Sequence, residues 1–471
     1  MDIYINGEAH RTQAEFDVFN PLNQKKIASV PDAGEEEAKL AVDAAYHAFH
    51  EWKETSAEER AGFLWRWHKL IDEHKEEMAE TMTKEQGKPL KEALGEVNYA
   101  NQYISWYAEE ARRIYGETIP ASKRDKRILV QKQPVGVMAA ITPWNFPAAM
   151  ITRKVAPAIA AGCSVLIKPA EQTPLTAIRL VELAHEAGAP AGLINIVTGD
   201  AKTISNVWLS DSRVRKLSFT GSTEVGKLLM KKSADTMKRI SLELGGQAPF
   251  VVLADADLDK AAAGAVASKF RNAGQTCICS NRFFVHESVA EPFTEKLKEA
   301  VKKLRVGDGM DPDTDIGPLI DKHAYEKVTR HISEAVDHGA DAAVGGKGFE
   351  SDLGYFVEPT VLTNVEDSML CMREETFGPV LPVSTFTDEE DAIQRANDTP
   401  FGLAAYLFTE NLTKALTLSE KLDYGIVGLN DGAPSAAQAP FGGFKESGLG
   451  REGGHHGIEE YLETKYISIG L

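Results

Sequence analysis

The sequence predicts an α/β protein with two lobes and a small additional β element. Short apolar segments alternate with helical segments from about residue 135, which is typical of βαβ units in a parallel sheet. A second alternating series begins near Asp257 and indicates a second lobe. The 471 residues are 43% hydrophobic and 26% charged, which suffices for large cores and excludes a disordered chain.

The region from about residue 35 to 115 is expected to be helical. Apolar residues recur there at three- and four-residue spacing, which predicts helices at Glu35–Trp52, Ala57–Gln86 and Pro89–Tyr115. A basic stretch with β character follows at Arg124–Gln133. It has no obvious packing partner nearby in the sequence.

The first alternating series predicts a parallel sheet, which would bind its ligand at the carboxyl ends of the strands. Strands are expected at Val135–Ile141, Cys163–Ile167, Leu193–Val197, Val214–Phe219 and Phe250–Leu253. The intervening helices are expected at Pro147–Ala161, Pro174–Gly188, Thr203–Leu209 and Thr223–Ala234.

The second series and the tail complete the expected elements. Helices are predicted at Leu258–Phe270, Val289–Leu304 and Lys322–Gly339. Strands are predicted at Val361–Val365, Val380–Phe386, Ala404–Phe408 and Gly425–Leu429, and the tail Tyr466–Leu471 is β-like.

Charge and cysteine content narrow the function. The 52 basic and 70 acidic side chains leave a net charge of −18, which disfavours nucleic-acid and membrane partners. There is no apolar run of about 18 residues and no secretory leader, and four cysteines make no disulfide framework. A cytoplasmic protein is therefore expected. Cys277 and Cys279 have no second pair or nearby histidines to complete a metal site, so no metal is expected.

A glycine-rich turn follows one predicted strand. Gly221–Lys227 has the spacing of a phosphate-binding loop, but Leu228 stands where Ser or Thr would bind Mg²⁺, which disfavours nucleotide hydrolysis. The turn and the N–H groups of the next helix suit a pyrophosphate. Alternatively, Ser222 or Thr223 only caps that helix.

A thiol and a carboxylate have the surroundings of catalytic groups. Cys277 lies in a tight glycine-containing turn between a predicted helix and a strand at Arg282–Val285, where a nucleophile can be both held and exposed. Glu243 stands among apolar residues, which raise the pKa of a carboxyl group and suit it to general-base work. The ordinary alternatives are a buried, unreactive cysteine and a solvated glutamate on an edge strand.

Six ordered motifs resemble those of the aldehyde dehydrogenase superfamily and extend over essentially the whole chain. They are TPWNFP at 142–147, IKPAE at 167–171, FTGS at 219–222, ELGG at 243–246, GQTC at 274–277 and EETFGP at 374–379. The resemblance implies the aldehyde dehydrogenase-like fold. In that fold a Rossmann-like NAD(P)-binding domain would comprise 1–115 and 135–244, a catalytic domain 245–446, and an oligomerisation arm 116–134 and 447–471.

The resemblance also implies the catalytic groups. Cys277 would attack the aldehyde to give a thiohemiacetal. The Asn145 side chain and the Cys277 backbone N–H would donate to its oxyanion, and one such donor is worth about 3 kcal/mol. Hydride transfer to the nicotinamide would leave a thioester, and water activated by Glu243 would hydrolyse it.

The family's cofactor contacts fall on eight residues here. Lys168 and Glu375 would hold ribose hydroxyls, Phe377 would pack near the nicotinamide, and Ser222 would meet the pyrophosphate. Glu171 would accept from the adenosine ribose and repel a 2′-phosphate, so NAD is expected to be preferred and NADP to be a weaker cofactor. The full set is Thr142, Trp144, Lys168, Glu171, Gly221, Ser222, Glu375 and Phe377.

Within the superfamily the chain is most similar to succinate-semialdehyde dehydrogenases, which implies a role in 4-aminobutyrate degradation. Arg153 and Arg271 would clamp the carboxylate of a semialdehyde, with Ser435 as a further donor. Each arginine could instead make a structural ion pair. Glutarate semialdehyde and sulfolactaldehyde are alternative substrates, because both present a similar anionic tail.

Two further features follow from the resemblance. Cys279 is associated with a reversible disulfide to Cys277 that would stop catalysis, the alternative being a packing role. The Arg124–Gln133 and Tyr466–Leu471 segments resemble the family's oligomerisation arm, so a homodimer or homotetramer is expected.

Two rival functions make different demands on the motif residues. A protein that keeps the fold only for binding or scaffolding would have lost Cys277, Glu243 or Asn145, and all three are present. An enzyme that passes the acyl group to coenzyme A or phosphate is disfavoured by Glu243, which favours water as the acceptor.

Overall fold

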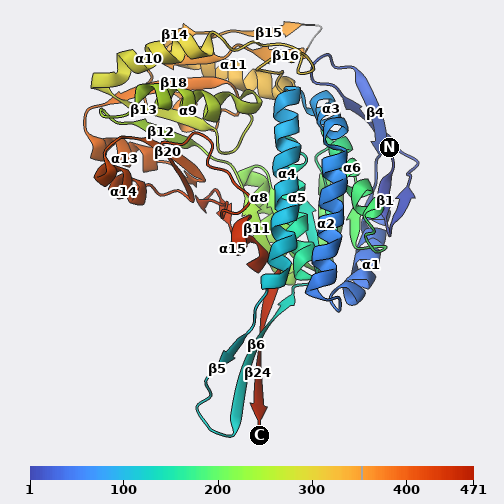
Figure 1. The fold of residues 1–471 in the computed structure, drawn as a ribbon. Coiled ribbons are helices and arrows are strands. Elements are labelled where there is room, and N and C mark those ends of the chain that lie inside the picture. The colour runs from blue at the N-terminus through green and yellow to red at the C-terminus, as the bar shows by residue number, and fades with distance from the viewer. Residues whose placement is uncertain (352–353) are drawn as a thin grey trace.

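Two lobes and a projecting arm make up the molecule in the computed structural model, which describes residues 1–351 and 354–471 (Figure 1). Each lobe is built around its own sheet, so the predicted α/β class is confirmed. No helix among the described residues is both long and apolar enough to cross a membrane.

The sheet of the first lobe has eight strands, parallel in its centre and antiparallel at both edges. Its strands are β1 (Ile3–Ile5), β2 (Glu8–His10), β7 (Val137–Ile141), β8 (Ser164–Lys168), β9 (Ile194–Ile196), β10 (Val214–Thr220), β11 (Arg239–Glu243) and β23 (Gly448–Leu449). Their order is β2-β1-β9-β8-β7-β10-β11-β23. The strands from β9 to β11 are parallel, so their carboxyl ends meet at one edge.

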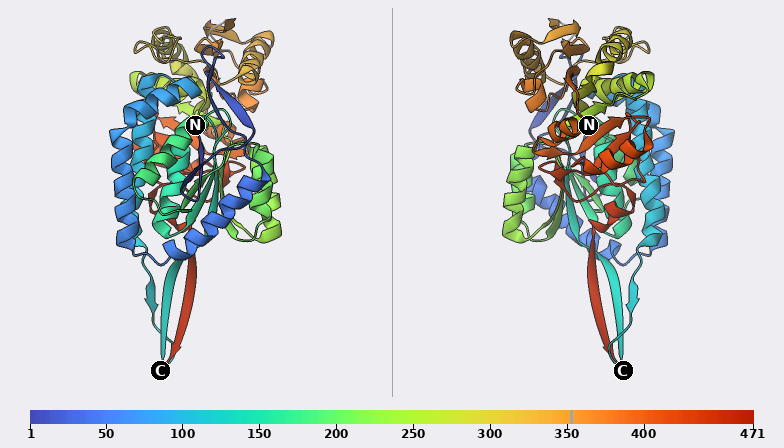
Figure 2. Two further views of the ribbon diagram at one scale, coloured as in Figure 1. Left: turned by 90° about the vertical axis from the view of Figure 1, so that its right-hand side faces the viewer. Right: turned by 90° about the vertical axis from the view of Figure 1, so that its left-hand side faces the viewer.

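Helices cover both faces of this sheet (Figure 2). One face carries α5 (Ala149–Ala161) and α6 (Pro174–Glu186) beneath an outer layer of α2 (Ala57–Glu73), α3 (Lys75–Gln86) and α4 (Leu90–Glu110). The other face carries α1 (Glu35–Trp52), α7 (Ala201–Ser210) and α8 (Thr223–Ser233).

One predicted helix is in fact two. The segment Ala57–Gln86 divides into α2 and α3 because the chain leaves helical geometry at His74, where φ is −111° and ψ is 12°. This break lets α3 turn and pack against α6. The apolar spacing continues through His74, so the sequence pattern does not reveal the break.

The second lobe contains a seven-stranded sheet in the order β14-β17-β18-β13-β12-β20-β21. Its strands are β12 (Ala248–Val252), β13 (Ser280–His286), β14 (Asp341–Val344), β17 (Thr360–Thr363), β18 (Val380–Phe386), β20 (Ala404–Phe408) and β21 (Ile426–Leu429). Its helices are α9 (Leu258–Phe270), α10 (Glu287–Val301), α11 (Lys322–Asp337), α12 (Leu370–Arg373), α13 (Glu389–Asn397) and α14 (Leu412–Lys421).

Three short two-stranded pairs and a short helix complete the body. The pairs are β3 (Glu15–Phe19) with β4 (Lys26–Pro31), β15 (Gly348–Ser351) with β16 (Gly354–Val357), and β19 (Phe401–Gly402) with β22 (Phe444–Lys445). The helix α15 (Gly454–Glu459) packs against α4 and α5.

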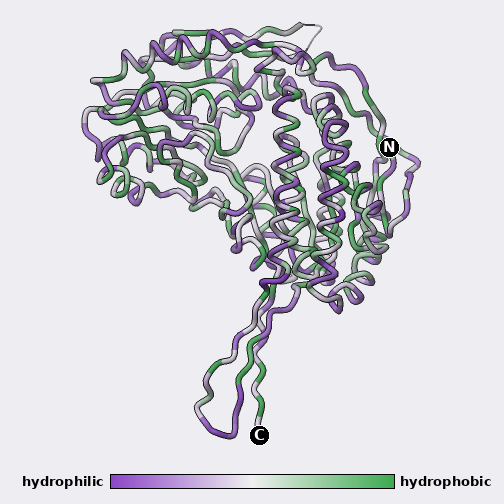
Figure 3. Tube along the Cα trace, in the orientation of Figure 1, coloured by the Kyte–Doolittle hydropathy of each residue, from purple (hydrophilic) through white to green (hydrophobic). Residues whose placement is uncertain are grey.

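The arm is a three-stranded antiparallel sheet of β5 (Glu117–Ile119), β6 (Lys126–Pro134) and β24 (Leu462–Gly470). Hydrophobic positions continue along it away from both lobes (Figure 3). The C-terminal part of the arm is shorter than the expected 447–471. It begins at Leu462, because β23 joins the first sheet and α15 packs on its helices.

Each lobe has its own hydrophobic core. The chain passes from the first to the second through residues 244–247, between β11 and β12. It returns to the first lobe at β23. The carboxyl edge of the first sheet therefore meets the second lobe where the ELGG motif crosses.

Candidate active site

Cofactor residues predicted from the sequence follow successive parallel strands. Thr142 follows β7 and its N–H donates to the Lys168 carbonyl at 3.1 Å, where β8 ends. Gly221 and Ser222 follow β10, and the Ser222 hydroxyl accepts from the Val225 N–H at 3.4 Å at the start of α8. Ser222 therefore caps the helix, as the alternative interpretation proposed, at the same edge where a ligand is expected.

The nucleophile turn contains three successive residues with left-handed backbone. Asn272, Ala273 and Gly274 have φ values of 52°, 54° and 74°. A Cβ on Gly274 would lie 2.2 Å from the Gly378 carbonyl oxygen, so only glycine fits there. Non-glycine residues in this region are strained, and such strain gathers at functional sites.

Hydrogen bonds hold this strained turn. The Asn272 N–H donates to the Glu92 carboxylate at 2.8 Å, and its side chain donates to the Asn145 carbonyl at 3.0 Å. The Asn145 amide donates to the Gln275 carbonyl at 3.0 Å. The second hydrogen of that amide has no partner among the described residues, and neither has the Cys277 backbone N–H. Two donors near the thiol are thus free to meet an oxyanion.

A cavity of about 290 Å³ joins the thiol to most of the predicted cofactor residues. Trp144 and Phe377 meet edge to face across it, with ring centroids 5.6 Å apart. The predicted residues that line it are Trp144, Asn145, Gly221, Ser222, Cys277, Glu375 and Phe377. Thr142, Lys168, Glu171 and Glu243 are not part of its lining.

The cavity has the donors and acceptors that a dinucleotide needs. The hydroxyl of Thr220, which lines the cavity, is buried and has no partner among the described residues, and the same holds for the hydroxyl of Thr142 outside the lining. The N-terminus of α8 faces the same edge and suits a pyrophosphate. Glu375 accepts from the Gly246 N–H at 3.0 Å, and burial raises its pKa to about 7. These residues fit a nicotinamide dinucleotide.

The surroundings of Cys277 favour its neutral thiol over the thiolate. Burial raises its pKa to about 12, although the charge of Arg153 acts in the opposite direction. Gly246 lets the nucleophile turn pack closely against the segment that joins the two lobes, since a Cβ on Gly246 would lie 2.4 Å from the Cys277 carbonyl oxygen. The second glycine of ELGG thus makes room for the nucleophile's own backbone.

Glu243 is buried beside a group of charges. It ends β11, its Oε2 has no partner among the described residues, and burial followed by the charge of Glu452 raises its pKa well above the ordinary value. Burial alone would raise the pKa of Glu452, but Arg153 and Lys154 bind its carboxylate and lower that pKa. The neutral form is therefore favoured at Glu243 and the ionised form at Glu452.

A second cavity, of about 220 Å³, reaches the other side of the thiol. All three predicted substrate residues, Arg153, Arg271 and Ser435, line it together with Cys277. Its remaining wall is largely apolar and includes Phe146, Met150 and Phe441. The pocket is therefore an apolar channel with cationic groups near the nucleophile.

The two arginines differ in how far they are neutralised. Arg153 is fully buried and its Nε contacts Glu452, but its Nη2 has no partner among the described residues. Arg271 has no carboxylate at ion-pair distance among the described residues. Its guanidinium lies 5.4 Å from the centre of the Phe146 ring. The structural ion pair considered from the sequence is thus present at Arg153 and absent at Arg271.

Cys279 faces away from solvent and toward a buried lysine. The Lys269 ammonium donates to the Cys279 sulfur at 3.7 Å and to the Asn281 side chain at 3.3 Å. Burial raises the pKa of the Cys279 thiol, while Lys269 acts to lower it. Both Cys277 and Cys279 are free thiols.

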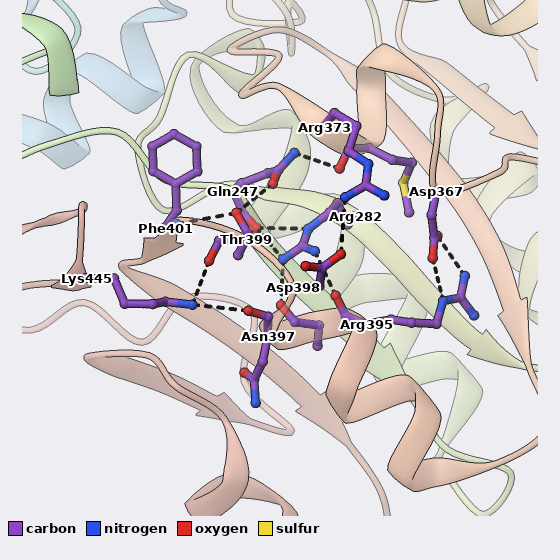
Figure 4. A network of polar contacts seen from close by, with 12 residues as sticks. Gln247, Arg282, Asp367, Arg373, Arg395, Asn397, Asp398, Thr399, Phe401 and Lys445 are labelled. Atoms are coloured by element: carbon purple, nitrogen blue, oxygen red, sulfur yellow. Dashed lines mark hydrogen bonds and ion pairs between the residues drawn. The ribbon is translucent and has the colours of Figure 1, made fainter.

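The crossing between the lobes is fixed by a buried arginine (Figure 4). Arg282 donates to the Gln247 carbonyl and to the carbonyls of Arg395 and Ala396 at the end of α13. The Gln247 side chain accepts from Thr399 at 3.0 Å. The residues directly after the ELGG motif are therefore anchored to the second lobe.

Three buried charges near the site were not predicted from the sequence. Lys88 pairs with Glu96 at 2.5 Å and donates to the Asn145 carbonyl at 2.7 Å. Glu452 and Lys269 are likewise almost fully buried. Their partners lie far away in the chain or on another element, so local composition marks them only as ordinary charged positions. No cluster of metal-binding side chains occurs within residues 1–351 and 354–471.

Comparisons with known proteins cover nearly the whole chain. The aldehyde dehydrogenase family model matches residues 8–467. A succinate-semialdehyde dehydrogenase [NADP(+)] of Escherichia coli is 55% identical over 99% of this chain and 97% of its own. A glutarate-semialdehyde dehydrogenase of Pseudomonas putida is 52% identical, with 99% and 97% covered. The crystal structure of succinate-semialdehyde dehydrogenase from Burkholderia pseudomallei superposes with a TM-score of 0.98 at 50% identity, with 100% and 98% covered.

Proposed function

The chain belongs to the aldehyde dehydrogenase family, and on this premise we propose that it oxidises succinic semialdehyde to succinate. The main support for this substrate is the 220 Å³ cavity, in which Arg271 and Cys277 share a wall and the Arg271 guanidinium has no carboxylate partner among residues 1–351 and 354–471. Ser435 and the free Nη2 of Arg153 add donors to the same cavity. A carboxylate offers only acceptors and so complements these groups.

Cys277 is proposed as the nucleophile. Its thiol would release its proton to water, its sulfur would form a bond to the aldehyde carbon as the C=O π electrons move onto oxygen, and the second hydrogen of the Asn145 amide and the Cys277 N–H would donate to the resulting oxyanion. Such donors act strongly because they are already in place and shielded from water. A nicotinamide dinucleotide in the larger cavity would supply the hydride acceptor. Trp144, Ser222, Glu375 and Phe377 would hold it there.

Glu243 is proposed to activate the water that hydrolyses the thioester on Cys277. A carboxyl group with a raised pKa can accept a proton near neutral pH once ionised. Glu243 lies outside the lining of either cavity beside the thiol, so its side chain must turn toward the thiol to act.

The substrate is tested by comparing succinic semialdehyde with butanal, which lacks the carboxylate. A hydrogen bond to a charged group is worth about 1.5–3 kcal/mol, so two arginines should give a kcat/KM ratio of roughly 10² or more. Arg271→Gln should reduce this ratio at least about tenfold. Arg305→Gln, at an exposed arginine paired with Asp313, is the matched control. A ratio near one in the native enzyme would remove the substrate assignment and leave aldehyde oxidation.

Glutarate semialdehyde is the second candidate substrate, supported by the 52% identical relative that acts on it. Sulfolactaldehyde also carries an anion a few atoms from its carbonyl. The same kinetic comparison with all three anionic aldehydes ranks them, and a higher kcat/KM for either alternative would replace succinic semialdehyde.

NAD is proposed as the preferred nicotinamide cofactor. Support comes from Glu171, whose carboxylate contacts Lys168 at the end of β8 and remains 44% exposed. A carboxylate there accepts from ribose hydroxyls and repels a 2′-phosphate. Glu171→Gln should raise kcat/KM with NADP relative to NAD. A native enzyme that is more efficient with NADP, the cofactor named for the E. coli relative, would contradict the preference.

Three broader features complete the proposal. The first lobe binds the cofactor, with residues 1–115 and 135–244 as its main part, and residues 245–446 carry the nucleophile. The arm adds strands to a neighbouring copy and makes a homodimer or homotetramer. The enzyme works in the cytoplasm, which the four free cysteines support.

A further inference from the structure

Tyr99 stands where the substrate pocket opens to the outside. The 220 Å³ cavity beside Cys277 is followed outward by one of about 490 Å³. The residues that line both are Tyr99, Phe146, Arg271 and Ala433. These four therefore form the junction between the outer and inner cavities. Arg271 and Tyr99 are its two polar members.

The Tyr99 hydroxyl is oriented by a buried neighbour. It lies 2.6 Å from the hydroxyl of Tyr103, one turn further along α4, and the two rings meet edge to face with centroids 5.1 Å apart. Tyr103 is completely buried, and neither hydroxyl has another partner among the described residues. Of the two hydroxyl hydrogens in this pair, one forms the hydrogen bond between the tyrosines and the other remains for a further acceptor.

Counting donors fixes the direction of this hydrogen bond. If Tyr99 donated to Tyr103, the hydrogen of Tyr103 would point into the protein without an acceptor, which is unfavourable. If Tyr103 donates to Tyr99, the hydrogen of Tyr99 is left for an acceptor in the cavity that Tyr99 lines. Burial raises the pKa of Tyr103, so its hydroxyl stays protonated and can donate.

The three carboxylates that line the outer cavity with Tyr99 already have other partners: Glu96 binds Lys88 and the Ala148 N–H, Glu92 accepts from the Asn272 N–H, and Asp315 binds Lys91. Arg153, which lies close enough to influence both tyrosines, contributes only donors, and its own Nη2 is free. Arg271 on the same junction is also without an ion-pair partner among the described residues. Three unused donors therefore surround one pocket, which is the complement of an acceptor-only group.

We propose that the Tyr99 hydroxyl donates a hydrogen bond to the anionic tail of the substrate and is a specificity-determining residue for anionic over neutral aldehydes. Tyr103 is a positioning residue that donates to Tyr99 and directs its hydrogen into the pocket. The assignment rests on the proposed function, because it needs a substrate whose tail is an anion. A chain of two hydroxyls ending on a charge is also strengthened by mutual polarisation.

The test compares Tyr99→Phe and Tyr103→Phe with the native enzyme, using succinic semialdehyde and butanal. Tyr99→Phe should lower kcat/KM for succinic semialdehyde about tenfold or more, through KM with little change in kcat, as expected for a lost hydrogen bond to a charge. Its kcat/KM for butanal should stay within about twofold. Tyr103→Phe should shift KM in the same direction by a smaller factor, because the Tyr99 hydroxyl remains but is no longer directed.

Tyr115→Phe is the matched control, since that side chain is 72% exposed and lines neither cavity. Equal losses for both aldehydes, or no change in KM for succinic semialdehyde, would overturn the inference.

Thermal unfolding of each variant identifies a loss caused by misfolding, and succinate as an inhibitor gives a readout independent of turnover. The Ki of succinate should rise in Tyr99→Phe, and an unchanged Ki would also overturn the inference. A native enzyme that does not prefer succinic semialdehyde to butanal would instead refute the proposed function.

Discussion

The carboxyl group of Glu243 makes the rate of hydrolysis depend on pH. Burial, followed by the charge of Glu452, raises the pKa of this carboxyl group, so its ionisation to a base is shifted to higher pH. We expect kcat to increase with pH when hydrolysis limits the rate, because the ionised form is the one that accepts the proton of water. Steady-state kinetics over a series of pH values would measure the increase.

Glu243→Gln is the control for that assignment. The amide keeps the shape but cannot accept the proton, so acylation of Cys277 should proceed while turnover stops. A burst of reduced cofactor without steady-state turnover is the expected result. A kcat that does not change with pH in the native enzyme would show that a different step limits the rate.

Cys279 gives a second prediction for single residues. A disulfide with Cys277 would protect the nucleophile from irreversible oxidation, and the nearby Lys269 ammonium favours the Cys279 thiolate that forms when the bond is reduced. Peroxide should therefore inactivate the native enzyme reversibly, with recovery in dithiothreitol. Cys279→Ala should lose this recovery, and Cys371→Ala, at another buried free thiol, is the control. Full recovery of Cys279→Ala would rule out the disulfide.

The residues of the site were predictable to very different degrees. Cys277 and Asn145 stand in compact motifs, and the structure brings both to the same cavity. Glu452 could not be foreseen, because the need for it arises from Arg153 and Lys154, which are buried beside it only in the folded chain. Tyr99 and Tyr103 are spaced like any buried helical pair, so the pattern alone identifies them as core.

At the scale of elements, Gly274 links the backbone of the nucleophile turn to activity. Gly274→Ala would place a methyl group 2.2 Å from the Gly378 carbonyl oxygen and force the turn to move. A displacement of about 1 Å near the reacting groups can reduce activity roughly 10²-fold. We expect kcat to fall by about that factor, as measured by steady-state kinetics.

The variant Gly339→Ala distinguishes the effect of the steric clash at Gly274 from the effect of placing alanine in a left-handed backbone. Gly339 also has a left-handed backbone, with φ of 101°, but no atom lies within 4 Å of the position that a Cβ would occupy there. Both variants should lose about 1–2 kcal/mol of unfolding free energy from the left-handed residue. Only Gly274→Ala should lose activity, and comparable kinetics for the two variants would contradict the role of the turn.

Elements with strong periodic patterns were predicted closely. Leu258–Phe270 and Val380–Phe386 have the expected bounds, because an amphipathic helix and a fully apolar strand each carry a clear local signal. The strands β1 and β2, at one end of the first sheet, were missed. They are only three residues long, and β1 is stabilised by pairing with the distant β9 rather than by its own composition.

At the scale of the whole molecule, the arm is expected to hold copies of the chain together. Its strands project beyond both lobes and leave Tyr466 and Leu471 largely exposed. Removing residues 464–471 would deprive β6 of most of its partner strand. Light scattering at micromolar concentration should show a dimer or tetramer for the full chain and a smaller species for the truncated one.

The control for this truncation removes Leu471 alone, which leaves β24 intact. That variant should assemble like the full chain. A monomeric full-length protein would contradict the role of the arm, whereas an unchanged assembly of the truncated chain would place the contacts elsewhere.

The late position of Glu452 in the chain delays folding of the first lobe during synthesis. Arg153 and Lys154 leave the ribosome almost 300 residues before the carboxylate that neutralises them, since the separations are 299 and 298 positions. At about 5–20 residues per second, this delay is roughly 15–60 seconds. During that interval the nascent first lobe would have to bury two cations without a counter-charge, which is strongly unfavourable. Its folding is therefore expected to finish only after nearly the whole chain has been translated, so chaperones would encounter it as an open intermediate.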